Sequence, residues 1–83
     1  MNASVTAILT AFAALSLDAY ISDGSVSAFL VHNGRGYNII ANSSRTILHA
    51  CSTTPGAPDG YEVARFYGAP DVTIARAVAR LAV

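Results

Sequence analysis

The sequence predicts an α+β domain: an N-terminal helix, a three- or four-stranded antiparallel sheet and a C-terminal helix, in one small domain over residues 1–83. Apolar side chains recur at helical spacing near both ends of the chain, and an Asn-Gly pair separates two β-rich runs in the middle. Hydrophobic residues make up 53% of the chain and charged residues 12%, which excludes an intrinsically disordered protein.

The first expected element is a helix from Ser4 to about Tyr20, begun by a capping side chain at Asn2 or Ser4. The positions that form its apolar stripe are Val5, Ile8, Leu9, Phe12, Leu15 and Ala19. Its other side is only weakly polar, which indicates that this side is partly covered as well. The cluster at residues 22–25 is expected to be a turn.

A hairpin is the clearest local signal in the chain. Residues 26–31 and 37–42 are β-rich, and Asn33-Gly34 lies between them, where both residue types tolerate positive φ. The alternation assigns one face of the hairpin to the core: Val26, Ala28, Leu30, Tyr37, Ile39 and Ala41. The opposite face is half apolar, which is unusual for a sheet face left in water.

The sequence pattern fits both a strand and a helix in two segments. Residues 45–51 are favoured as a third strand, although the apolar spacing also fits a short helix. Residues 61–67 could complete the sheet as a strand, or form a helix capped by Asp59 with Glu62 in the capping-box position. Residues 53–60 are expected to be a loop, because they contain two prolines and two glycines. A C-terminal helix starts near Pro70, and its apolar stripe is Ile74, Ala75, Val78, Leu81 and Ala82.

The sequence predicts no catalytic set, no cofactor and no metal site. Cys51 is the only cysteine, and it has His49 near it in the sequence but no carboxylate close enough to orient that histidine. One cysteine and two widely separated histidines do not suit zinc. The aspartates occur where turns or helix starts explain them. We therefore expect a protein that is not an enzyme.

Residues 59–79 resemble the helix-turn-helix motif of small DNA-binding repressors. The motif's small residue, turn glycine and aliphatic residue are matched at the right spacing by Ala64, Gly68 and Ile74. The resemblance implies a DNA-binding regulator using residues 59–83, with Arg76 and Arg80 on the recognition helix. The formal net charge of zero disfavours a nucleic-acid partner, because such proteins draw most of their affinity from excess positive charge.

The preferred function is that of a small non-enzymatic protein-interaction module. A domain of this length buries little surface, and a single cysteine cannot form a disulfide within the chain. We therefore expect a protein partner, or a homodimer through the half-apolar outer face of the sheet, to cover the remainder. The expected contact residues are Phe29, Val31, Arg35, Ile40, Ile47, Arg65, Arg76 and Arg80. The size and the Arg/Ala-rich composition are similar to those of phage- or mobile-element-encoded inhibitors of host complexes, such as anti-CRISPR proteins. We expect a cytoplasmic location and no membrane partner, because the cysteine is free and the apolar N-terminal stretch is interrupted by polar residues.

Overall fold

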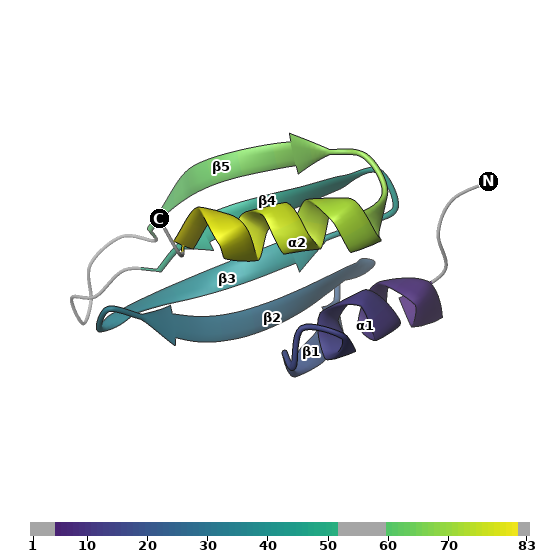
Figure 1. Cartoon of the computed structure of the whole chain (residues 1–83), viewed down its shortest axis with the longest axis horizontal. Helices are drawn as coiled ribbons and strands as arrows, with labels where there is room; N and C mark the ends of the chain where they lie inside the picture. Colours follow the sequence, from purple (N-terminus) through teal and green to yellow (C-terminus); the bar gives the residue numbers. More distant parts are fainter. Residues whose placement is uncertain (1–4, 52–59, 82–83) are drawn as a thin grey trace.

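The computed structural model describes residues 5–51 and 60–81, which form two layers (Figure 1). One layer is a five-stranded antiparallel sheet in the order β1-β2-β3-β4-β5. Its strands are β1 (Ala19–Ser22), β2 (Ser25–His32), β3 (Arg35–Ala41), β4 (Arg45–Ala50) and β5 (Tyr61–Tyr67). The other layer consists of α1 (Val5–Ala13) and α2 (Pro70–Leu81) on one face of the sheet. The predicted α+β order is confirmed, with five strands instead of three or four.

Several expected features lie outside the described residues. They are the capping side chains at Asn2 and Ser4, the loop over 53–59 with Asp59 at its end, and Ala82 in the apolar stripe of the last helix.

The first helix is shorter than predicted, because the chain leaves it at a left-handed residue. α1 ends at Ala13, and Ser16 adopts a φ of 59°. The Ser16 amide donates to the Ala13 carbonyl at 2.9 Å, and the Leu17 amide donates to the Phe12 carbonyl at 3.1 Å. This pair of hydrogen bonds is a Schellman motif, which satisfies the last carbonyls of the helix and redirects the chain. The residues after it form β1, which the sequence prediction missed.

Two tight turns connect the first three strands. Asn33 and Gly34 have φ values of 52° and 78°, and His32 pairs with Arg35 across the turn, which confirms the predicted hairpin. Asp23 and Gly24 repeat this geometry, with φ values of 49° and 76°, between β1 and β2. Positive φ at both central residues gives a type I′ turn, whose twist matches that of the flanking strands.

The two segments whose sequence fitted either a strand or a helix are both strands. Asn42 starts β4 by accepting hydrogen bonds at Oδ1 from the amides of Ser44 (2.9 Å) and Arg45 (3.0 Å), and this side-chain turn reverses the chain. β5 pairs with β4 along residues 61–67, with a bulge opposite Leu48 and His49. The alternative helices over 45–51 and 61–67 are therefore wrong.

The core lies between the sheet and the helices. Its buried side chains are Ile8, Phe12, Val26, Ala28, Ile39, Ala41, Leu48, Ile74, Ala77 and Leu81. Every strand residue in this set lies on the face that the alternation assigned to the core or on the matching face of β4. One buried polar contact anchors α2 to β4, where the hydroxyls of Thr46 and Thr73 lie 2.7 Å apart. Thr73 also donates to the Ala69 carbonyl, so the Thr46 hydroxyl is the donor to Thr73.

The helix-turn-helix interpretation of residues 59–79 is not compatible with this fold. Ala64 lies in β5, so the first helix of the motif does not exist. Gly68 is the connection between a strand and a helix, with a φ of 133° that only glycine adopts readily. Ile74 is a core residue of α2. The spacing matched by chance, because a small residue, a glycine and an aliphatic residue also suit a strand–turn–helix unit.

Candidate functional site

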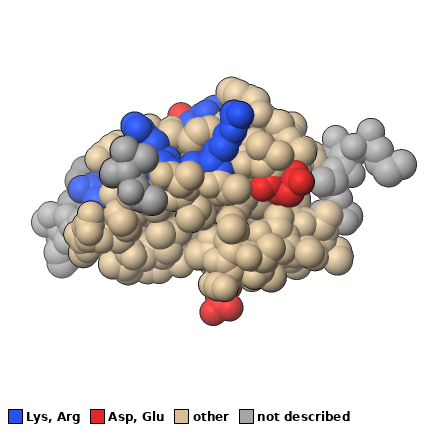
Figure 2. Space-filling view, viewed as in Figure 1, with Lys and Arg blue, Asp and Glu red and all other residues tan. Residues whose placement is uncertain are grey.

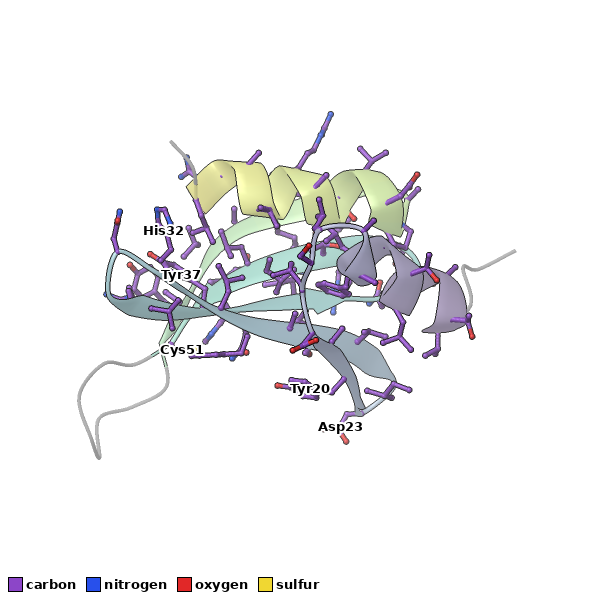
Figure 3. All side chains as sticks on the ribbon, turned by 60° about the horizontal axis from the view of Figure 1, so that its bottom comes forward. Tyr20, Asp23, His32, Tyr37 and Cys51 are labelled. Atoms are coloured by element: carbon purple, nitrogen blue, oxygen red, sulfur yellow. The ribbon has the colours of Figure 1, made fainter. Side chains whose placement is uncertain are left out.

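The candidate site is the face of the sheet opposite to the helices, which we call the outer face. The register assigns to it Tyr20, Ser27, Phe29, Val31, Gly36, Asn38, Ile40, Arg45, Ile47, His49, Glu62, Arg65 and Tyr67. Cys51 joins them, because its sulfur accepts a hydrogen bond from Asn38. Figure 3 shows Tyr20 on this side of the sheet, with the helices on the other side. Among the described residues, no helix or strand covers this face.

One row of the outer face crosses all five strands. The register places Tyr20, Ser27, Ile40, Ile47 and Arg65 opposite one another from β1 to β5. Ile40 and Ile47 are half-buried by their neighbours, and Ser27 is buried. The row thus has an apolar centre with an aromatic ring at one end and a guanidinium group at the other.

Large apolar side chains are exposed on this face, both in the row (Tyr20) and beside it (Phe29, Val31 and Tyr67). The exposed fractions are 55% for Phe29, 63% for Val31, 52% for Tyr20 and 69% for Tyr67. Tyr20 on β1 and Phe29 and Val31 on β2 are in neighbouring strands, whereas Tyr67 lies apart from them on β5. Neighbouring exposed apolar side chains form a patch of the kind that often marks an interaction site.

Phe29 lies across the neighbouring strand rather than pointing straight into solvent. A Cβ atom built at Gly36 would meet two atoms of the Phe29 ring at 2.8 and 2.9 Å, so the ring occupies the space that a side chain at this position would fill. The ring of Phe29 can therefore pack over the backbone of β3 because Gly36 has no side chain. An aromatic side chain held in this way presents its other face to a partner with little conformational freedom left to lose.

The β5 end of the outer face carries an ion pair. The Arg65 Nη2 atom lies 2.6 Å from the Glu62 Oε1 atom, and the two side chains are 34% and 42% exposed. Residues three apart in a regular strand point to opposite faces, but the bulge in β5 puts both of these on the outer face. The hydrogen bond from Arg65 lowers the pKa of Glu62, and the same bond raises the pKa of Arg65.

The structure divides the eight predicted contact residues into three groups. The first five lie on the outer face: Phe29, Val31, Ile40, Ile47 and Arg65. Arg76 and Arg80 are exposed on α2, in the other layer, where basic side chains stand out of a mostly uncharged surface (Figure 2).

Arg35 forms the third group, because it already has partners within the chain. It shares the helix-side face of β3 with Tyr37 and Ile39. Its guanidinium carbon lies 5.2 Å from the centre of the Tyr61 ring, and its Nη2 atom donates to the Cys51 carbonyl at 3.4 Å. These contacts tie the end of β3 to β4 and β5 rather than offering the charge to a partner.

Cys51, His49 and Asn38 lie together on the outer face without forming a catalytic set. Asn38 Nδ2 donates to the Cys51 sulfur at 3.3 Å, and His49 is opposite Asn38 in the register. No hydrogen bond joins His49 to Cys51 within residues 5–51 and 60–81. Over the same residues, no three His, Cys, Asp or Glu side chains gather closely enough to hold a metal ion.

Sequence reasoning missed Tyr20 and Tyr67 as members of the outer face. Helical spacing extends the first helix to Tyr20, although Asp23-Gly24 is a hairpin signal as strong as Asn33-Gly34 and predicts a strand on each side of it. Tyr67 lies two residues after Arg65 in the regular part of β5, so alternation puts both side chains on the outer face. It was missed because residues 61–67 fitted a helix as well as a strand.

No family model, curated protein or solved structure matches this chain. Within the part of the chain that the structure describes, neither helix has the length and hydrophobicity needed to cross a membrane.

Proposed function

We propose that this chain is a non-enzymatic protein-binding module and that the outer face is its binding surface. The observation that carries the proposal is the group of exposed large apolar side chains on that face, Tyr20, Phe29, Val31 and Tyr67. Both helices pack on the opposite face, so no described element of the chain itself can shield these groups from water.

The chemistry of the outer face suits a protein partner. Tyrosine, phenylalanine and arginine are enriched at the energetically dominant positions of protein interfaces. Ile40 and Ile47 form an apolar centre in the outer face, and Arg65 on the edge strand could make a charged contact. The acidic and basic side chains of the whole chain balance to a net charge of zero, so there is no strong positive potential of the kind that a nucleic-acid backbone requires.

We include an inhibitory role in this proposal. In this role the chain would act on a larger assembly by occupying one of its surfaces with the outer face. Inhibition of a host complex by a phage- or mobile-element-encoded protein is the form of this role that the size and composition favour, and it belongs to the same proposal.

Photo-crosslinking tests the proposal with a matched control. A benzoylphenylalanine group replaces Phe29 on the outer face in one variant and Val72 on α2 in the other, because the two positions have similar exposed fractions of 55% and 50%. In cells that encode the chain, we expect a specific crosslinked protein from position 29 and none from position 72. Crosslinking from position 72 alone, or to nucleic acid from position 29, would overturn the proposal.

A second variant tests whether the same contact carries affinity. Phe29→Ser with Val31→Ser removes two exposed apolar side chains and leaves the core intact. We expect at least a hundredfold loss of affinity for the crosslinked protein, since each side chain is expected to contribute more than about 1.4 kcal/mol to binding. The control Arg76→Ala with Arg80→Ala should leave the affinity unchanged, and the reverse result would place the binding surface on α2.

A further inference from the structure

β5 forms an edge of the sheet, and no described strand pairs with its outer side. β5 is the last strand in the order, and its only strand partner among the described residues is β4. It is seven residues long, whereas β1 at the other edge has four. The unpaired amides and carbonyls of an exposed edge strand can pair with a strand of another molecule. A long edge therefore needs either protection or a partner.

Because of the bulge, the acidic and basic residues of β5 lie on the same face, on either side of two apolar residues. Glu62 lies opposite His49, and Arg65 lies opposite Ile47, so both charged residues are on the outer face. Between them, Val63 and Ala64 are half-buried and pack against the core. Along β5, the order is therefore acid, two inward apolar residues, base.

We propose that β5 pairs with β5 of a second copy of this chain, antiparallel, about a two-fold axis between Val63 and Ala64. In this register, Glu62 of each copy lies opposite Arg65 of the other. Tyr61 lies opposite Phe66, and both of these are on the helix side because they pair with Ala50 and Thr46 within the chain. Residues brought opposite each other thus share a face, which the bulge makes possible at an odd register.

The charges select this register over its neighbours. Sliding the second strand by one residue in either direction places Glu62 opposite Phe66 or Ala64, and its carboxylate then lacks an opposite charge. A slide of two residues places Glu62 opposite Tyr67 or Val63, again without an opposite charge. A slide of three places Glu62 opposite Glu62 or Arg65 opposite Arg65, which like-charge repulsion disfavours. Only the proposed register forms two ion pairs between the copies.

The helices leave room for this pairing. α2 packs on β4, with further contacts to β5 and β3. The two β4 strands of the pair would be three strand spacings apart, about 14 Å, and a helix with its side chains is about 10–12 Å wide. The two α2 helices therefore fit side by side over one continuous sheet. The outer faces of the two copies also join, and both stay open for the partner proposed above.

A charge-exchange experiment tests the pairing. Light scattering after size exclusion measures the mass of the wild-type protein, Glu62→Arg, Arg65→Glu and the control Asp18→Arg, which changes an exposed charge outside the sheet. We expect dimers for the wild type and the control and monomers for both β5 variants. An equal mixture of the two β5 variants should form a dimer, because one chain then carries two basic side chains at positions 62 and 65 and the other carries two acidic ones opposite them.

The mixture separates this proposal from an effect within one chain. Neither variant can form the intramolecular Glu62–Arg65 ion pair, so only pairing between chains can restore the dimer. A monomeric wild type, a mixture that stays monomeric, or β5 variants that remain dimeric would each overturn the proposal. If Phe29→Ser with Val31→Ser abolishes the dimer and Glu62→Arg does not, the dimer forms through the outer face instead, which also overturns it. Circular dichroism confirms that each variant is folded.

Discussion

The two faces of the sheet are built from the same strands and from similar residues, yet they differ in how much of their apolar surface is covered. Ile39 is completely buried under the helices, and Ile40, the next residue, is only half-buried on the outer face. Ala28 and Phe29 show the same contrast, with exposed fractions of 0% and 55%. Apolar composition alone therefore does not decide burial in this fold. The decisive factor is which face the two helices cover.

The helices divide the inner face between them. α1 contacts β1 and β2, α2 contacts β3, β4 and β5, and the two helices contact each other. Together they span the whole sheet, so neither is left to cover the outer face. Both described helices are therefore on one side of the sheet, and the outer face has no described helix over it.

The strongest test of this contrast exchanges the same residue type on each face. Ile39→Ala should lower the free energy of unfolding by about 2–5 kcal/mol, because it opens a cavity in the core. Ile40→Ala should cost at most about 1.5 kcal/mol, because part of its side chain is in water in both states. Urea unfolding of the two variants measures the difference. Equal losses would show that the outer face is covered by another part of the molecule.

A second test concerns the polar contact that fixes α2 to the inner face. Thr73→Val should cost about 1–3 kcal/mol, because it leaves the buried Thr46 hydroxyl without its acceptor. Adding Thr46→Val removes that unsatisfied group, so the double variant should recover most of the stability. Chemical unfolding of both variants checks this order, and a double variant weaker than Thr73→Val would contradict the assigned hydrogen bond.

The connection that brings the chain from α1 into β1 offers a stabilising change. Ser16 has a left-handed backbone, which glycine adopts without the steric cost that a Cβ atom imposes. Ser16→Gly should raise the stability by about 0.5–1 kcal/mol, and thermal unfolding should show a higher Tm. Ser16→Ala keeps the Cβ atom and serves as the control, so a gain in that variant as well would point to another cause.

The smallest effect is expected on the outer face, at the exposed ion pair. The pKa of Glu62 in the folded chain lies below its ordinary value of 4.5, because Arg65 donates a hydrogen bond to the carboxylate. The pair therefore adds stability above that ordinary value, and the contribution is lost as the pH falls through the folded pKa. Exposure keeps the contribution small. Glu62→Gln should remove it, so unfolding curves of the wild type and the variant, measured at a concentration at which both are monomers, should converge in acid.

The sequence was sufficient for features with a local physical cause. Asn33-Gly34 predicts the turn because both residues tolerate positive φ, and alternation around it correctly places Val26, Ala28, Ile39 and Ala41 in the core. The alternation also places Phe29, Val31 and Ile40 on the outer face.

Features that depend on tertiary pairing were not predictable in the same way. Residues 61–67 have strand and helix signals of similar strength, and pairing with β4 decides between them. The end of α1 could not be predicted, because its left-handed residue is Ser16 and not the glycine that usually signals a helix end. Strand alternation places Arg35 on the helix-side face of the sheet. Its contact with the Tyr61 ring could not be predicted in this way, because Tyr61 is far away in the sequence.

The strand order of the sheet has a consequence for how quickly the chain reaches its folded state. Each strand pairs with the one that follows it in the sequence, so the sheet contains no crossover. Contacts between near neighbours in the sequence require only short loops to close, and proteins rich in such contacts fold fast for their size. We expect the hairpin of β2 and β3 to form early and to act as the template to which the remaining strands are added.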